Sequence, residues 1–326
     1  MGSSPTAVAT DPHTGGAMTA LRMHEPGDLH QLRYEAAPRP VPGVGDVLVA
    51  VHAAGITPTE LAWPSTWTDR AGRGRRPVIP GHEFSGVVVA LGPGTTGVSV
   101  GDPVFGLADW YRDGSAATHL AVEARNLAAK PLSVSHVEAA CVPLAASTAW
   151  QALFVHGRLR AGQRVLVHGA AGGVGAFAVQ LARSAGATVI GTCRAPGALL
   201  DELGASRVVD LDRESFEDVG PVDLVLDLAG ADLAQRSWPL VRPGGTLVTV
   251  VGGVPRGRPR ADARWVFFVV EPDRRLLAEL ARSIDAGELR PVLGATFPLY
   301  GGAQAFEAKQ AGGVPGKVAL RVVEGD

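Results

Sequence analysis

The stretch HGAAGGVG, residues 168–175, constrains the fold most, because its glycines lie between an apolar strand pattern and a helical pattern. A second apolar run, ATVIGTC, follows the helical pattern within about thirty residues, which is the length of a βαβ unit. Glycines at such a turn let backbone N–H groups approach a pyrophosphate at the helix N-terminus. A glycine cluster also suits an ordinary strand-to-helix turn, but this context favours a dinucleotide site. That site would include Gly169, Gly172, Gly173, Val174 and Gly175.

Three further apolar runs continue a series of buried parallel strands: VDLVLDLAG, GGTLVTVVGG and RWVFFVVEP. The segment PDRRLLAELARSIDAGEL then has the apolar spacing of an amphipathic helix ending near Gly287. Residues 126–288 are therefore expected to form an α/β domain with a doubly wound parallel sheet, of the Rossmann type.

The flanking regions differ in pattern. Residues 18–125 have short apolar runs separated by glycine and proline, which predicts an antiparallel β domain. The pattern changes near Ser135, where Glu138 follows as in a helix capping box. Residues 289–326 return to a β pattern and are expected to rejoin the first domain. Residues 1–17 lack the basic and apolar regions of a secretory signal, so a disordered extension is expected.

Composition narrows the function classes. The 326 residues carry a formal net charge of -2 without a basic track, so nucleic acid is not an expected partner. No apolar run reaches the ~18 residues of a membrane span, which predicts a soluble protein with no membrane partner. The 2 cysteines exclude a disulfide framework and favour a reducing compartment, the cytoplasm.

The segment after the second strand indicates which dinucleotide is bound. NAD sites place an acidic residue there to hold the ribose hydroxyls. This chain has the uncharged Thr192 and Cys193 followed by Arg194. A cation at this position would attract the 2′-phosphate of NADPH, so NADPH is the predicted cofactor. Alternatively, Arg194 is an ordinary solvated loop charge.

Several motifs occur together in order: GHEFSGVV, GDPVFGL, LAASTAWQAL, VLVHGAAGGVGAFAVQLARSAGATVIGT and GKVALRVV. Together they resemble the medium-chain dehydrogenase/reductase superfamily, most closely its zinc-free quinone oxidoreductase-like (zeta-crystallin-like) branch. The resemblance covers about residues 20–323. It implies a GroES-like catalytic domain built from both chain ends, a Rossmann domain between them, and an active site in the cleft where they meet. It also implies a homodimer formed through the apolar strand RWVFFVV at the edge of the Rossmann sheet.

The same resemblance bears on metal binding. Zinc-dependent members take ligands from a Cys in the segment matching AGITPTE, from the His of Gly-His-Glu, and from a Cys or acid in the segment matching PLAASTA. Here the first position is Thr57, the second is His82, and the third segment offers no ligand. A catalytic zinc needs three protein ligands, so no metal is expected. His82 is predicted to be a hydrogen-bonded residue beside the cleft.

Hydride transfer to a simple ketone leaves a localised alkoxide, which usually needs a Lewis acid or a proton donor. Without a metal, the expected acceptors are a quinone or the conjugated double bond of an enone or enoyl thioester, which spread the charge themselves. The chain is therefore predicted to be an NADPH-dependent reductase of an apolar conjugated carbonyl or quinone. Two alternatives stay open: an NADP-dependent alcohol dehydrogenase, and a catalytically weak NADPH-binding sensor or scaffold.

Three side chains are candidate catalytic groups. Thr57 and Glu60 match positions that are often Asn and Asp near the cleft in zinc-free relatives; alternatively they are a turn residue and an exposed helix-start charge. Many relatives have a Tyr where this chain has Ala116, and Tyr111 on the same loop is the candidate replacement proton donor. Trp63 and Trp110 would wall an apolar substrate, or are simply packing residues.

The resemblance also implies further residues that line the cofactor cleft: Thr148, Val250, Val251, Gly252, Phe268, Val270 and Lys317. Phe268 and Val270 are otherwise expected to be strand core, and Lys317 an exposed turn charge.

Overall fold

The computed structural model describes residues 16–194, 197–252 and 262–324. One of its sheets has six parallel strands in the order β10-β9-β8-β11-β12-β13. In sequence order this is 3-2-1-4-5-6, the arrangement of doubly wound dinucleotide-binding folds. Chain order reverses between β8 and β11, and the carboxyl ends of the strands leave a crevice there. The strands are β8 (Arg164–His168), β9 (Thr188–Cys193), β10 (Arg207–Asp210), β11 (Val222–Asp227), β12 (Val241–Thr249) and β13 (Arg264–Phe267).

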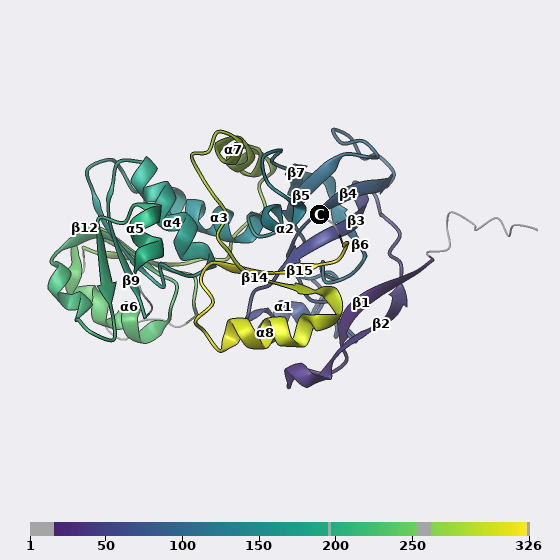
Figure 1. Cartoon of the computed structure of the whole chain (residues 1–326), viewed down its shortest axis with the longest axis horizontal. Helices are drawn as coiled ribbons and strands as arrows, with labels where there is room; N and C mark the ends of the chain where they lie inside the picture. The colour runs from purple at the N-terminus through teal and green to yellow at the C-terminus, as the bar shows by residue number, and fades with distance from the viewer. Residues whose placement is uncertain (1–15, 195–196, 253–261, 325–326) are drawn as a thin grey trace, which may run out of the picture.

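Of the helices in this part of the chain, the first three pack around the parallel sheet, whereas the last, Arg274–Asp285, contacts the strand Leu127–Ala129 of the second large sheet (Figure 1). They are α4 (Gly173–Ser184), α5 (Ala198–Leu203), α6 (Ala231–Ser237) and α7 (Arg274–Asp285). The side chain of Asp273 caps α7 by accepting from two backbone N–H groups. Gly287, with φ of 73°, ends the segment in the left-handed region, as the sequence predicts. The predicted α/β fold class is confirmed.

The second large sheet combines both ends of the chain. It holds seven strands in the order β14-β15-β3-β4-β5-β7, with β6 also paired to β3. Late strand β15 pairs antiparallel with early strand β3, bringing Ala319 opposite Gly55. The elements are β3 (Asp46–Gly55), β4 (Glu83–Leu91), β5 (Pro103–Leu107), β6 (His119–Glu123), β7 (Leu127–Ala129), β14 (Leu293–Pro298), β15 (Lys317–Arg321) and the adjoining helix α8 (Gly302–Gln310).

A separate hairpin, β1 (Ala17–Met23) with β2 (Leu32–Pro38), begins the described chain. Residues 1–15 of the predicted disordered extension lie outside the described residues. At Ala17 the prediction is wrong, because this residue pairs with Pro38 in the hairpin. Among the residues described, no helix is long and apolar enough to cross a bilayer.

Short helices lie between the two sheets (Figure 1). Ser135 and Glu138 form the predicted capping box at the start of α2 (His136–Ala139). The next helix, α3 (Pro143–Trp150), continues into a π-helical turn, Gln151–His156. π-helical turns are rare and are frequent at functional sites. A bridge between Gly172 and Gly316 also joins the glycine-rich turn to the C-terminal segment.

Candidate active site

The turn between β8 and α4 is shaped for close backbone approach. Gly169 has φ of 69°, a conformation that favours glycine. A Cβ on Gly175 would lie 2.3 Å from the Gly169 carbonyl oxygen, so a side chain there does not fit. Gly172 is the N-cap of α4 and provides no capping side chain, which leaves the first helical N–H groups available to an anion. The turn therefore fits a dinucleotide pyrophosphate.

A cavity of about 550 Å³ opens beside this turn. Arg194 lines it and is exposed. Arg236 lines it from α6, with its Nη2 atom 2.6 Å from Glu217 Oε1 and its guanidinium 4.8 Å from the Phe216 ring centroid. The cavity thus joins an aromatic wall and two arginines to the glycine turn, which fits the adenosine half of a dinucleotide. Its lining comprises Gly169, Thr192, Cys193, Arg194, Leu211, Glu214, Ser215, Phe216, Ala229, Gly230, Asp232, Leu233 and Arg236.

Thr192 supports the wall of this cavity through a buried hydrogen-bond chain. Ser237 Oγ donates to the Leu233 carbonyl at 2.7 Å, so it accepts from His168 Nε2, also at 2.7 Å. His168 Nδ1 then accepts from the Thr192 hydroxyl at 3.1 Å. Burial lowers the pKa of His168 to about 4, which keeps the imidazole neutral in this arrangement. The Thr192 hydroxyl is therefore committed to the protein interior.

The carboxylate of Asp227 fixes the crevice at the ends of β11 and β12. It accepts from the N–H groups of Ala229 and Gly230 at 3.1 and 3.0 Å, and from the Thr249 hydroxyl at 2.9 Å. Thr249 Oγ1 in turn accepts from the N–H of Val251 at 3.1 Å. These bonds hold the backbone of the predicted cofactor residues Val250, Val251 and Gly252 directly after β12.

Glu60 and His82 form a fully buried polar pair in the β domain. Glu60 Oε2 lies 3.6 Å from His82 Nε2 and accepts from the Gly81 N–H at 3.0 Å. Glu60 Oε1 accepts from the Thr57 N–H at 3.4 Å. Burial raises the pKa of Glu60 to about 8 and lowers the pKa of His82 to about 3. At neutral pH the pair is therefore a carboxylic acid beside a neutral imidazole. The alternative of Glu60 as an exposed charge is wrong, because its exposed fraction is 0%.

Two tryptophans enclose the imidazole of His82. The ring of Trp63 stacks on it with centroids 5.7 Å apart, and the ring of Trp110 lies 4.8 Å away. Among the described residues, neither ring nitrogen of His82 has a hydrogen-bond partner. The prediction that His82 is hydrogen-bonded is wrong, since its contact with Glu60 is too long for a hydrogen bond. A buried polar group without a partner requires an explanation, and a ligand group is one.

The donor set around His82 does not fit a catalytic zinc. In the segment where the resemblance implies the third ligand, the chain has only Leu144, Ala145, Ala146 and Ser147, and the N–H of Leu144 donates to Glu83 Oε2 at 2.9 Å. Glu83 Oε1 in turn lies 2.5 Å from Lys317 Nζ. In the part of the chain that the structure describes, no three His, Cys, Asp or Glu side chains are grouped to hold a metal ion. Glu60 and His82 alone fall short of the three ligands that such a site needs.

Two predicted cofactor residues are committed to contacts within the protein. Lys317 is buried, and its Nζ also donates to the Ile56 carbonyl at 2.7 Å. Its stem crosses the glycine turn, since a Cβ on Gly173 would lie 2.5 Å from Lys317 Cδ. The alternative prediction, that Lys317 is an exposed charge in a turn, is wrong because the side chain is buried. The hydroxyl of Thr148 donates to the Leu144 carbonyl at 2.7 Å, so α3 itself satisfies it.

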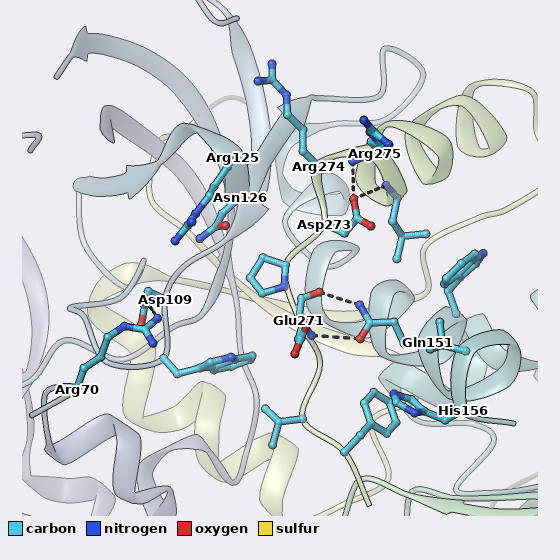
Figure 2. A pocket seen from close by; sticks show the side chains of 17 residues that line it. Arg70, Asp109, Arg125, Asn126, Gln151, His156, Glu271, Asp273, Arg274 and Arg275 are labelled. Atoms are coloured by element: carbon cyan, nitrogen blue, oxygen red, sulfur yellow. Dashed lines mark hydrogen bonds and ion pairs between the residues drawn. The ribbon is translucent and has the colours of Figure 1, made fainter. Parts of the chain in front are cut away.

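A larger cavity, about 1110 Å³, lies between the β domain and the segment that follows β13 (Figure 2). Trp110 lines it, and its ring also lies 4.8 Å from that of His82, whereas His82 and Glu60 themselves are not among the lining residues. Tyr111 is not among the lining residues. Its ring lies under the Arg70 guanidinium, 5.2 Å from ring centroid to Cζ. The structure therefore brings Trp110, and not the predicted Tyr111, into the cavity.

Phe268 also lines this cavity, whereas Val270 does not. Both side chains are buried, and the Phe268 ring lies 4.3 Å from that of His156 in the π-helical turn. Gln151, at the start of that turn, donates to the Glu271 carbonyl at 2.7 Å and accepts from the Glu271 N–H at 3.1 Å. This pair of bonds, drawn in Figure 2, fixes the segment after β13 against the continuation of α3.

Sequence patterns did not indicate Arg236, Gln151 or His156. Gln151 contacts Glu271, His156 contacts Phe268, and Arg236 contacts Phe216. The spacing of these residues along the sequence does not predict the contacts. Only Gln151 could have been found from the sequence, because it lies three residues after Thr148 in the motif LAASTAWQAL.

Comparison with known proteins agrees with this geometry. Residues 43–132 match the alcohol dehydrogenase GroES-like domain family, and residues 203–320 match the zinc-binding dehydrogenase family. The chain is 31% identical to a protein of Arthroderma benhamiae named "Probable zinc-binding oxidoreductase, mitochondrial", over 97% of this chain and 99% of that protein. It is 32% identical to the 2-methylene-furan-3-one reductase of Solanum lycopersicum, over 85% of this chain and 72% of that protein.

Among solved structures, the quinone oxidoreductase from Coxiella burnetii superposes with a TM-score of 0.88 at 28% identity, covering 94% of this chain and all of that one (100%). A β-rich domain and a doubly wound domain with a dinucleotide crevice define a nicotinamide-dependent oxidoreductase. The chain belongs to the medium-chain dehydrogenase/reductase superfamily and resembles its quinone and enoyl reductase members, as its sequence motifs indicate.

Proposed function

We propose that the protein uses NADPH to reduce a conjugated carbonyl compound or quinone without a catalytic metal. The observation that carries the proposal is the buried pair of Glu60 and His82 against Trp110, in which neither imidazole nitrogen has a hydrogen-bond partner among the described residues; burial favours the neutral form of both groups. Such a pair provides neutral donors next to an aromatic wall, which suits an apolar acceptor that develops charge on oxygen. The reductase and quinone oxidoreductase relatives support the same chemistry.

NADPH would supply the hydride, held by the glycine turn and the cavity beside it. When hydride adds to the conjugated carbon of an enone, the negative charge moves to the carbonyl oxygen. In this proposal the N–H of His82, against the cavity-lining Trp110, would donate to that oxygen, and the Glu60 carboxyl group, 3.6 Å from His82, would supply the nearest proton. The reaction is completed when a proton reaches the reduced substrate. Trp63 and Trp110 exclude water around these groups, which strengthens each hydrogen bond.

The preference for NADPH rests on charge. No acidic residue ends β9, whereas Arg194 follows it directly and lines the adenosine cavity. Arg236 adds a second guanidinium, although Glu217 already pairs with it. A 2′-phosphate would meet the cation of Arg194, which forms no ion pair with a carboxylate among the described residues.

The test is NADPH oxidation by chelator-treated protein with matched quinones, enones, enoyl thioesters and simple ketones, and with NADH in parallel. Turnover confined to conjugated acceptors supports the proposal. Activity lost to the chelator and restored by zinc would overturn the metal-free mechanism and favour an alcohol dehydrogenase. Retained NADPH binding with no turnover on any acceptor would favour a binding protein.

We also propose that the protein is a homodimer located in the cytoplasm. β13 is at the edge of the parallel sheet, where Phe267 is 44% exposed, and nearby Val269 is 59% exposed. An exposed apolar edge strand is an aggregation hazard unless a second strand covers it. The two cysteines, Cys141 and Cys193, are both buried and are not joined in a disulfide, which is compatible with a reducing compartment.

A further inference from the structure

We infer that Arg70 is a positioning residue, which acts through the buried carboxylate of Asp109 to hold Trp110 in place. The ring of Trp110 in turn packs against the imidazole of His82. The inference rests on the proposed function, in which this imidazole donates to the acceptor beside the tryptophan. Arg70 itself lines the larger cavity with a side chain that is 69% exposed, and it has no assigned contact with the reacting atoms.

The chain around Asp109 carries the tryptophan to the imidazole. The N–H of Ala108 donates to the carbonyl of His82 at 2.7 Å, which fixes the backbone one residue before Asp109. One residue after it, the ring centroid of Trp110 lies 4.8 Å from that of His82 and 5.5 Å from that of Trp63. Asp109 therefore lies between the fixed backbone and the ring, so a shift of its side chain would move the ring.

The carboxylate of Asp109 needs compensation within the protein, because its side chain is only 5% exposed. Its Oδ1 atom accepts from the N–H of Tyr111 at 2.8 Å, and its Oδ2 atom is bonded to Nη2 of Arg70. Within the described residues, Arg70 is the only cation paired with this carboxylate. Removing the guanidinium would leave a buried charge with a single N–H partner, which is an unfavourable arrangement that the loop would relieve by moving.

The ion pair is better held than an isolated surface pair, which usually contributes little. The Cζ atom of Arg70 lies 5.2 Å from the ring centroid of Tyr111. In the same turn of the chain, Arg75 Nη2 lies 2.7 Å from Asp113 Oδ1. The turn is thus attached to the loop of Asp109 at two points, and Figure 2 shows the first of them at the side of the cavity.

The same carboxylate also acts on His82 through its charge. Burial, and after it the positive charge of Arg75, lowers the pKa of His82 to about 3, whereas the negative charge of Asp109 acts in the opposite direction. The guanidinium of Arg70 cancels part of that negative charge. Arg70 therefore supports the neutral imidazole as well as the position of the tryptophan.

The experiment compares the wild type with Arg70→Gln, Arg70→Lys and the double variant Arg70→Gln/Asp109→Asn. With cyclohexenone as acceptor, Arg70→Gln should lower kcat/KM about tenfold, the loss expected for a charged hydrogen bond. The affinity for NADPH should change by less than about twofold, because Arg70 does not line the adenosine cavity. Arg70→Lys should recover part of kcat/KM, and the double variant should recover most of it, because no uncompensated charge remains.

The position of Trp110 is measured independently of turnover by circular dichroism. Two indoles as close as Trp63 and Trp110 give an exciton couplet, which Trp110→Phe identifies by its loss. The couplet should weaken in Arg70→Gln and return in the double variant. The matched control is Arg73→Gln, since Arg73 is 81% exposed in the same turn, pairs with Asp69 and does not line the cavity.

Two results would overturn the inference. An unchanged couplet in Arg70→Gln would show that Arg70 does not hold the tryptophan, whatever the kinetics. Equal losses of kcat/KM in Arg70→Gln and in the double variant would show that Arg70 does not act through Asp109. A wild type that reduces no conjugated acceptor would instead refute the proposed function, and the couplet would still decide the role of Arg70, so the two failures are distinguishable.

Discussion

Lys317 Nζ lies 2.5 Å from Glu83 Oε1, and both side chains are almost completely buried. Lys317 begins β15 near the C-terminus, and Glu83 begins β4 in the first third of the chain. Glu83 Oε2 also accepts from the Leu144 N–H at the start of α3. One ion pair therefore ties the C-terminal strand, the Gly-His-Glu segment and the helix beside the cofactor crevice together.

Replacing Lys317 by Met is expected to reduce the free energy of unfolding by about 3–5 kcal/mol, because it leaves a buried carboxylate without its counter-charge. Adding Glu83→Gln should restore most of that stability, since the amide oxygen still accepts from Leu144 and no charge remains. Urea unfolding of the wild type, the two single variants and the double variant measures both effects. A loss below about 1 kcal/mol for Lys317→Met would show that the pair is not a structural link.

Glu60 is expected to make kcat fall at alkaline pH. Its pKa is raised from 4.5 to about 8 by burial, so ionisation above that pH removes the proton beside His82. We expect kcat to fall as pH rises through about 8. Glu60→Gln should have a lower kcat with no such fall, because the amide stays neutral. A wild-type pH profile that is flat up to pH 10 would contradict the assigned role.

The same shift makes folding stability depend on pH. Between pH 4.5 and about 8 the unfolded chain releases the Glu60 proton, whereas the folded protein keeps it. The contribution of Glu60 to the free energy of unfolding is therefore greatest below pH 4.5 and is lost as pH rises to about 8. His82 acts in the opposite direction, because its pKa is lowered to about 3 and the folded state disfavours its protonation at acid pH. Thermal unfolding of Glu60→Gln should lack the loss of stability between pH 4.5 and about 8, whereas the acid decline from His82 should persist.

Five of the six parallel strands could be predicted from sequence because each leaves an apolar run, and the glycine turn marks the first of them. The short, partly exposed β10 leaves no such run and was not predicted. The capping pair Ser135 and Glu138 was equally local, so it was found correctly. The contacts between β15 and β3 depend on chain ends about 260 residues apart. Only the resemblance to a known family indicated that they meet.

The candidate site was predicted less completely. Glu60 was singled out, but its neutrality depends on burial by residues from distant elements, which spacing does not reveal. Trp110 and Tyr111 are adjacent, and sequence alone does not decide which faces the cavity. The arginine Arg236 reaches the adenosine cavity from a helix that follows β11, so it has no spacing relationship with the glycine turn.

Arg194 should determine the preference for NADPH over NADH. Replacing it by Gln is expected to weaken NADPH binding about tenfold and to leave NADH binding within about twofold, because only NADPH carries the 2′-phosphate. Arg213→Gln is the matched control, since Arg213 is 85% exposed and does not line the adenosine cavity. Fluorescence titration with both nucleotides gives the two constants. Equal losses for NADPH and NADH would show that Arg194 acts on the shared part of the cofactor.

The exposed edge of the parallel sheet should decide the oligomeric state. Phe267 ends β13 and is 44% exposed, so a second copy pairing along this strand would bury it. Replacing Phe267 by Asp places a charge in that contact and is expected to convert a dimer into a monomer. Light scattering at micromolar concentration measures the mass. The control is Tyr34→Asp, at an aromatic residue of β2 that is 49% exposed. A wild-type protein that is already monomeric, or a Phe267→Asp variant that stays dimeric, would place the interface elsewhere or remove it.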